Sequence, residues 1–401
     1  MRTGIYVAAI FLTAAFSLQS YAQQSLWGGA QVTSPQINED NTVTFRLSAP
    51  EASSVQVTGD CIPERKVAVE DGREIAVRTA DMTRDDKGVW SYTVPEPLPS
   101  ELYSYNLIVD GVKVTDPSNV YMIRDVASVF SVFIIGGGQG DLYSVSDVPH
   151  GTVSRLWYHS NSLGMERRLT VYTPAGYENC SKKYPVLYLL HGMGGDEEAW
   201  ISLGRTAQIM DNLIAQGKAE PMIVVMPNGN SWQDAAPGES PAGLVLPGMD
   251  RSRSMEGSFE ESFPEIVDFI EDHFRTVERK SGRAVAGLSM GGFHSLHLSA
   301  YYPDMFDYIG LFSAAIKPRE GLDTPVYADM EQKLALQFSR KPVLYYIAIG
   351  NSDFLYDDNS AYRAYLDSKG YPYEYHESEE GHIWKNWRIY LSDFVPMLFH
   401  D

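Results

Sequence analysis

Cysteine is scarce in this chain, with 2 residues among 401, which excludes a scaffold held together by disulfide bonds. A bridge between Cys61 and Cys180 would need an oxidising compartment, and we expect two separate buried thiols instead. Positive charge is also scarce, because 32 Lys and Arg stand against 52 Asp and Glu, a formal net charge of −20. That balance excludes nucleic acid and anionic membrane surfaces as partners. Histidine and cysteine are not found together at metal-ligand spacing, so we expect no metal and no other cofactor.

The first 22 residues have the pattern of a signal peptide. Arg2 gives a short basic start, the apolar stretch Ile5–Leu18 is too short to span a bilayer, and Ser20-Tyr21-Ala22 resembles a cleavage site. No cysteine lies near that point, so we expect no lipid anchor. The sequence predicts export, with the mature protein periplasmic or secreted.

Residues 23–135 read as a small all-β sandwich. Apolar and polar residues alternate in short runs that Gly- and Pro-containing turns separate, and no long helical pattern appears; the runs are 43–47, 54–57, 74–78, 90–94 and 103–109. Trp90, Tyr103 and Tyr105 occupy alternate strand positions, where packing in the core is a simpler role than binding a glycan. The glycine-rich, polar segment 136–150 is expected to be a linker.

Residues 151–401 have the pattern of an α/β domain with a mainly parallel sheet. Continuously apolar runs are typical of strands buried on both faces, and they alternate with segments of helical period. The expected strands are 169–172, 186–190, 223–226, 284–288, 308–312, 343–349 and 373–376, and the expected helices are 207–214, 259–276, 293–302, 327–338 and 360–368.

The stretch Ala284–Gly292 combines a short apolar run with Gly-x-Ser-x-Gly and is followed at once by a helical segment. This order predicts a nucleophile elbow, in which Ser289 stands exposed on a tight turn between a strand and a helix. The start of that helix favours developing negative charge beside the serine.

A serine nucleophile needs a base, and the base needs a group that orients it. Asp353 directly follows the apolar strand 343–349, and His382 follows the strand 373–376, which is the chain order of an α/β-hydrolase triad. Asp357 and Asp358 lie deeper in the same loop and are alternative acids. The other histidines fit less well: His376 falls within a strand pattern, and His294 and His297 lie on the helix after the serine.

The expected oxyanion hole needs two N–H donors. One is the backbone N–H of Met290, directly after the serine. The other is that of Met193, in the glycine-rich loop His191–Gly195 after the strand 186–190. His191 has no second histidine or cysteine near it at the spacing of a metal site.

The glycine-, proline- and serine-rich segment Asn228–Ser258 is long for a loop in a compact domain. It is either a lid or pocket wall for an acyl group, or mobile surface. We take Trp232, in this segment, and Trp384, close behind His382, as candidate substrate-binding residues; Trp384 and its neighbour Trp387 either line the cleft or pack beneath it.

Several of these motifs carry a family resemblance. Those of the second half are Tyr184–Gly195, Ile223–Gly229, Gly287–Gly292, Asn351-Ser-Asp and Gly381-His-Ile-Trp, and they resemble the esterase-D-like α/β-hydrolases, above all the feruloyl and acetylxylan esterases of carbohydrate esterase family 1. The series Trp90…Tyr103-x-Tyr105…Asp110-Gly111…Asp116-Pro117-x-Asn119 resembles the early-set immunoglobulin-like (CBM48-like) modules that precede glycan-active enzymes.

The resemblance implies that Ser289, Asp353 and His382 form a catalytic triad, with Met193 and Met290 as backbone donors. It also implies a serine esterase that acts on feruloylated or acetylated xylan or arabinoxylan oligosaccharides. Enterochelin esterases share the two-domain layout and are an alternative. A non-catalytic glycan-binding surface protein is a second alternative, against which the intact triad counts.

Overall fold

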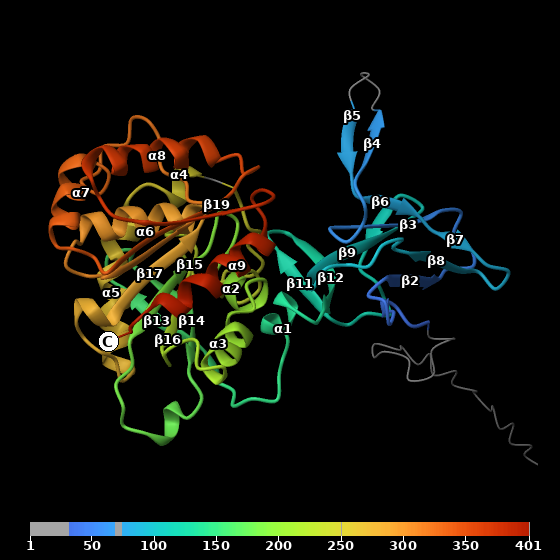
Figure 1. Ribbon diagram of the computed structural model, residues 1–401, viewed down its shortest axis with the longest axis horizontal. Coiled ribbons are helices and arrows are strands. Elements are labelled where there is room, and N and C mark those ends of the chain that lie inside the picture. The colour runs from blue at the N-terminus through green and yellow to red at the C-terminus, as the bar shows by residue number, and fades with distance from the viewer. Residues whose placement is uncertain (1–31, 69–73, 250, 401) are drawn as a thin grey trace, which may run out of the picture.

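The computed structural model describes residues 32–68, 74–249 and 251–400 of the chain. It consists of an all-β module followed by an α/β domain, as the sequence predicts (Figure 1). The predicted signal peptide, residues 1–22, lies outside the described residues. None of the helices in the described part is both long and apolar enough to cross a membrane.

Two sheets face each other in the module, with a core that contains Trp90 and Tyr105. Packing is therefore the observed role of these two rings, and Tyr103 packs against the same core. The first sheet has the order β1-β2-β8-β7, with β1 (Gln36–Ile37), β2 (Val43–Ser48), β8 (Val89–Thr93) and β7 (Thr83–Arg84). The second has the order β11-β12-β9-β3-β6, with β10 beside β9: β11 (Met122–Asp125), β12 (Ser128–Ile135), β9 (Glu101–Val109), β3 (Val55–Gly59), β6 (Thr79–Asp81) and β10 (Val112–Val114).

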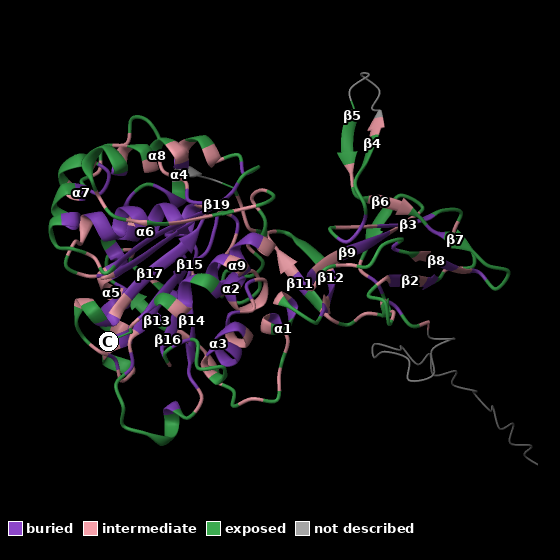
Figure 2. Ribbon diagram, in the orientation of Figure 1, coloured by how far each residue is buried: buried purple, intermediate pink, exposed green. Residues whose placement is uncertain are grey.

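The hairpin β4 (Arg65–Ala68) and β5 (Glu74–Val77) projects away from the rest of the module (Figure 1). The strand expected at 74–78 thus exists, but it pairs in this hairpin and not in the sandwich. Its alternation of apolar and polar residues does not bury one face, since Glu74, Ile75 and Ala76 are all exposed (Figure 2).

The α/β domain is built on an eight-stranded sheet of order β13-β14-β16-β15-β17-β18-β19-β20. The first two strands run antiparallel to their neighbours and the remaining pairs are parallel. The strands are β13 (Thr152–Ser160), β14 (Met165–Thr173), β15 (Val186–Leu190), β16 (Ile223–Pro227), β17 (Arg283–Leu288), β18 (Tyr308–Phe312), β19 (Leu344–Gly350) and β20 (Glu374–Ser378). The sequence pattern did not predict β13, an edge strand whose residues are mostly not buried.

Helices cover both faces of this sheet (Figure 1). The α-helices are α1 (Gln139–Tyr143), α2 (Ala199–Ser202), α3 (Thr206–Ala215), α4 (Arg251–Ser254), α5 (Ser258–His273), α6 (Met290–Tyr301), α7 (Met330–Ser339), α8 (Tyr356–Lys369) and α9 (Trp384–Phe394). Short 3₁₀ helices occupy η1 (Tyr177–Asn179), η2 (Lys280–Gly282) and η3 (Val395–Met397).

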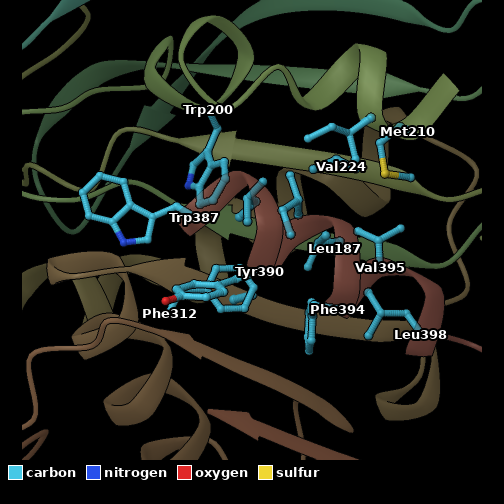
Figure 3. Close-up of a cluster of buried hydrophobic side chains, with 14 of the residues drawn as sticks. Leu187, Trp200, Met210, Val224, Phe312, Trp387, Tyr390, Phe394, Val395 and Leu398 are labelled. Carbon is cyan, nitrogen blue, oxygen red and sulfur yellow. The ribbon is translucent and has the colours of Figure 1, made fainter. Parts of the chain in front are cut away.

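The sequence of strand β15 is continuously apolar because both faces of the strand are buried. Leu187 and Leu189 face one hydrophobic cluster, whereas Val186, Tyr188 and Leu190 face the other. Helices α3 and α9 close the first cluster, and α5 to α8 contribute to the second. Figure 3 shows the first cluster, in which side chains of α9 such as Tyr390 and Phe394 lie beside Phe312 of β18.

The module and the α/β domain share this first cluster. Leu102, Ile123 and Val132 of the module belong to it together with Trp200 and Trp387. The module thus has a core of its own and, in addition, docks on the α/β domain through apolar side chains of this shared cluster.

The connecting segment 136–150 is also ordered where it contains α1. Tyr143 is fully buried, and Asn212 of α3 donates hydrogen bonds to the carbonyl oxygens of Asp141, Leu142 and Ser144. This part of the predicted linker is thus bound to the α/β domain, because side chains of that domain donate hydrogen bonds to its backbone carbonyl oxygens.

The two cysteines are free in the structure. Cys61 is buried in the module core, as expected, whereas Cys180 is exposed, so the expectation of a buried thiol is wrong for Cys180. Cys180 lies next to the 3₁₀ helix η1, on an irregular surface segment that has no apolar period.

A buried ion pair joins the two parts, and its loss should destabilise the whole chain. Glu101 of β9 and Arg388 of α9 lie 2.9 Å apart, with side chains 4% and 3% exposed. Glu101→Ala leaves the Arg388 charge buried without its carboxylate and should lower the free energy of unfolding by about 3 kcal/mol. Urea unfolding checks this, with exposed Glu51→Ala in the same module as the control, for which we expect a loss below about 0.5 kcal/mol. A loss as small for Glu101→Ala would contradict the structure.

Candidate active site

Ser289 lies on the tight turn between β17 and α6, as the sequence predicts. Its backbone is strained, with φ 53° and ψ −111°, in a region that few non-glycine residues adopt. The turn brings main chains into contact: a Cβ atom on Gly291 would lie 2.2 Å from the carbonyl oxygen of Leu190. Glycine is therefore required two residues after the serine, and the motif reflects a steric constraint.

Asp353 and His382 meet above the carboxyl ends of β19 and β20. Asp353 Oδ2 and His382 Nδ1 lie 2.8 Å apart, and the aspartate side chain is fully buried. Burial raises the pKa of Asp353, but the hydrogen bond and charge of His382 and the N–H of Leu355 outweigh it, so that the pKa is lowered overall. The carboxylate is thus ionised and can hold one tautomer of the imidazole.

The loops that carry these two residues are tied together. Ser352 N–H donates to the carbonyl of Glu380, and the Asn386 side chain donates to the carbonyls of Glu379 and Gly381. The His382 ring also packs against Trp387, at 4.9 Å between ring centres. These contacts fix the position of the histidine relative to the sheet.

None of the alternative acids and bases takes part in this arrangement. Asp358 pairs with Lys317 at the surface, and Asp357 is exposed in the first turn of α8. His294 is fully buried and pairs with Glu260, while His376 lies 3.7 Å from Asp393. His297 is also buried, and burial lowers its pKa to about 3.

The glycine-rich loop His191–Gly195 runs directly beside the nucleophile. A Cβ on Gly192 would lie 2.3 Å from Leu288 and 3.4 Å from the Cβ of Ser289. The backbone of Met193 follows at once, and Met290 begins α6, where the first N–H groups have no partner within the helix. Both expected donors therefore come from segments adjacent to Ser289.

His191 holds this loop in place. Its Nε2 accepts the N–H of Gly229 at 2.8 Å, and its Nδ1 lies 2.7 Å from the carbonyl of Gly192. Burial lowers the pKa of His191 to about 4, so the imidazole is neutral at physiological pH and Nδ1 carries the proton. The histidine is a buried structural group that joins two loops of the site.

The segment Asn228–Ser258 divides into two parts. Asn228, Asn230 and the residues up to Ala236 are largely buried, and Asn230 donates to the carbonyl of Gly195. Arg167 reaches the carbonyl oxygens of Asn228 and Asn230. The later part exposes Leu244, Leu246 and Met249. The first part thus supports the glycine-rich loop, and only the second part resembles a lid.

The two candidate tryptophans are placed differently. Trp384 and Trp387 line the cavity that Ser289 and His382 also line. Trp232 is not among the residues that line it, because its ring lies under the Arg253 guanidinium at 4.4 Å and its indole N–H points to Ser254. The structure therefore does not support the expectation that Trp232 lines the substrate pocket.

A cavity of about 1340 Å³ brings the predicted residues together. Ser289, His382, Met193 and Met290 line it. It exceeds the ~300–1,000 Å³ typical of ligand pockets because it extends between the α/β domain and the module, to residues such as Tyr103. A chain-like substrate with its ester at Ser289 would therefore contact both parts.

Sequence reasoning missed two groups at this cavity. Phe354, next to Asp353, is 76% exposed and packs on the His382 ring at 4.6 Å between centres. Arg124, Asp125 and Val126, at the turn of the module between β11 and β12, also line the cavity. The aromatic residue directly after the triad acid is a signal that the sequence offers. The turn carries no such signal, since only docking of the module brings it to the site.

Residues 160–398 match the family described as "Putative esterase". This chain belongs to that esterase family. Residues 29–122 match carbohydrate-binding module 48, the isoamylase N-terminal domain. The esterase is a carboxylic ester hydrolase, as predicted, and the resemblance of its N-terminal part to CBM48 modules is confirmed.

Individual relatives agree with this assignment. The esterase is 32% identical over 300 residues to an endo-1,4-beta-xylanase/feruloyl esterase of Xylanibacter ruminicola, a match that covers 73% of this chain and 37% of that protein's length. A CE1 ferulic acid esterase from the anaerobic fungus Anaeromyces mucronatus has the same fold, with a TM-score of 0.53, 24% identity, and coverage of 70% of this chain and 97% of that one.

A third similarity extends over both parts of the esterase. The enterobactin esterase of Shigella flexneri superposes with a TM-score of 0.57 at 16% identity, covering 88% of this chain and 92% of that one. At this identity the similarity concerns the fold, and it includes the module.

The position of Asp353 leads to a test of the acid. Asp353→Asn should keep the fold but lower kcat about 10³–10⁴-fold, because the amide no longer fixes the tautomer of His382 or stabilises its charged form. Asp357→Asn and Asp358→Asn are matched controls that lie outside the contact and should each cost less than about tenfold. Steady-state kinetics of the three variants on methyl ferulate or an aryl acetate decides it. A large loss in either control with little loss in Asp353→Asn would refute the assignment.

The environment of His191 predicts loss of stability in acid. Its pKa is lowered to about 4 in the folded state, whereas a free histidine has about 6.5. The unfolded chain therefore binds a proton that the folded chain does not, and this contribution to stability is complete above pH 6.5 and lost as the pH falls towards 4. His191→Gln should reduce the fall in unfolding free energy between pH 7 and pH 5 by about 1–2 kcal/mol. Urea titrations at both pH values measure it, and an unchanged fall would contradict the prediction.

Proposed function

We propose that this esterase hydrolyses feruloyl or related hydroxycinnamoyl esters on plant xylan through an acyl-enzyme. Ser289 attacks the ester carbonyl, His382 takes its proton and passes it to the sugar leaving group, and Asp353 orients the imidazole and stabilises the imidazolium. The backbone N–H groups of Met193 and Met290 bind the oxyanion. Water then releases the acid by the same steps.

One observation carries the proposal: the strained Ser289 and the Asp353-paired His382 line a single cavity. The walls of that cavity include apolar side chains such as Met249, Phe354 and Trp384. An aromatic acyl group is flat and mainly apolar and suits such walls. The relative that combines a xylanase with a feruloyl esterase supports the same substrate class.

The charges at the cavity favour a neutral substrate over an anionic catecholate. The lysine and arginine side chains that line it in the described part of the chain each pair with a carboxylate: Arg78 with Glu64, Arg124 with Asp196, Arg155 with Glu198, Arg168 with Glu197, Lys385 with Glu380, and Arg388 with Glu101. A catecholate siderophore would have to compete with a carboxylate for each of these cations. Feruloylated arabinose carries no charge and needs none of them.

We also propose that the chain is exported after cleavage behind Ala22. The division at 23–135, 136–150 and 151–401 remains our assignment of the domains, although the two parts share a core. Export would place the enzyme where plant polysaccharide is found. The proposed catalytic steps use no metal and no nucleotide.

A panel of esters tests the substrate. We expect release of ferulate from methyl ferulate and feruloylated arabinoxylan oligosaccharides with kcat/KM at least tenfold above that for acetate release from acetylated xylan and for a catecholate siderophore. Ser289→Ala, which keeps the cavity, is the matched control and should reduce kcat by about 10⁶-fold on every substrate. Preference for acetylated xylan or for the siderophore would replace the feruloyl proposal, and full activity of a folded Ser289→Ala would refute the mechanism.

A further inference from the structure

The residues that follow the glycine-rich loop form an unusually acidic turn, Asp196-Glu197-Glu198. Asp196 is 1% exposed and Glu197 is fully buried. Carboxylates buried this deeply need charged partners. Arg168, on β14 of the same domain, pairs with Glu197 at 2.7 Å and with Glu198 at 3.0 Å. The partner of Asp196 comes from elsewhere.

Asp196 pairs with Arg124 of the N-terminal module. The Arg124 guanidinium lies 2.5 Å from Asp196 Oδ2, and Asp196 Oδ1 accepts the N–H of Glu198. Asp196 is the residue directly after Gly195, so the ion pair fixes the end of the loop that carries Met193. Without Arg124, the buried Asp196 carboxylate would have no cationic partner. A movement of the loop that exposes this carboxylate to water would then be favoured.

The next residues of the module touch the same loop. A Cβ built on Gly194 would lie 3.0 Å from Val126 Cγ1, so the valine sits directly on the backbone beside Met193. Val126 itself has φ 50°, a conformation that costs a β-branched residue energy. Arg124 also donates to the Val126 carbonyl at 2.9 Å, so one side chain holds both the strained turn and the loop.

The same turn reaches the opposite side of the cavity. The Trp384 side chain, two residues after His382, lies near Asp125, and its indole N–H offsets part of the rise that burial causes in the Asp125 pKa. The module therefore contacts the loop beside the nucleophile and the helix behind the base at once, and the Glu101–Arg388 pair holds it there.

We propose that the module turn Arg124–Val126 positions the glycine-rich loop for oxyanion binding, with Arg124 as a positioning residue and the module as part of the catalytic structure. The inference rests on the proposed role of the Met193 N–H, but not on the identity of the acyl group. A donor displaced from the developing charge lowers the rate of the chemical step and leaves ground-state binding largely intact. The turn acts through the loop and does not itself react.

The test compares two variants of the full chain on 4-nitrophenyl acetate, with phenylboronic acid as an inhibitor. The boronic acid forms a tetrahedral adduct with the serine Oγ, so its Ki reports on the oxyanion site and not on the fraction of folded enzyme. We expect Arg124→Ala to lower kcat about 10- to 100-fold and to raise Ki by a similar factor, with KM within about twofold. Arg124→Lys, which keeps the charge, should recover most of both changes.

Val126→Gly keeps the test decisive if Arg124→Ala does not fold. Glycine adopts the positive φ without strain and leaves the ion pair in place, so only the contact on Gly194 is lost. We expect a three- to tenfold fall in kcat with a matching rise in Ki. Arg84→Ala, an exposed arginine of the module that contacts the Pro50 carbonyl, is the control and should change neither by more than twofold.

Two results would overturn the proposal. One is a kcat and Ki within twofold of the unmodified enzyme in the folded variants. The other is a rise in KM alone, which would make the turn a binding surface. The assay uses a simple acetate, so this test does not depend on a preference for feruloyl esters. A folded Ser289→Ala variant that kept its activity would refute the proposed mechanism, independently of the role of the turn.

Discussion

The main chains that follow β15 and β17 lie in direct contact, and this contact sets the geometry of the site. Gly192 fits against Leu288 and Ser289, and Gly291 fits against the Leu190 carbonyl, at distances that admit no side chain. The parallel pairing of β15 with β17 brings the two turns to the same edge of the sheet. The loop with the oxyanion donor and the nucleophile are therefore placed by one sheet register, and a shift of either strand would move both. The strained backbone conformation of Ser289 persists because the surrounding packing fixes the position of the turn.

Around that contact the protein uses charge to hold loops. Its net charge is −20, yet the arginines near the cavity are committed to buried or half-buried carboxylates, as Arg168 is to Glu197 and Arg124 to Asp196. Such pairs add little net stability relative to apolar packing, but they fix geometry because breaking one leaves a buried charge. The pairs thus hold the loops around the cavity, and each Lys or Arg that lines it in the described part of the chain already has a carboxylate partner. The acidic surface beyond it is consistent with solubility and with a neutral polysaccharide partner.

The sequence predicted the parts of the site that depend on local pattern and on strand ends. Ser289, Asp353 and His382 each follow a strand in the parallel part of the sheet, so their meeting at one edge follows from the parallel pairing, and the Asp353–His382 contact is observed. Contacts between the module and the α/β domain were not predictable. Glu101 and Arg388 are separated by 287 positions, and neither stands in a motif. Trp232 was chosen for its type and its loop, but its neighbour Arg253 covers it.

The shared core changes what the N-terminal module can do. A module tethered by a flexible linker would bring a polysaccharide near the enzyme without orienting it. Here Leu102 and Ile123 of the module are buried with Trp200 and Trp387 of the α/β domain, so the two parts present their surfaces in a fixed relation. Any glycan held by the module face of the cavity would have its ester at a set distance from Ser289. The similarity in fold to the enterobactin esterase extends over 88% of the chain at 16% identity, so the fold they share includes residues of the module. Docking of the module beside the active site therefore makes the module part of the wall that a bound substrate contacts, and not a separate binding unit.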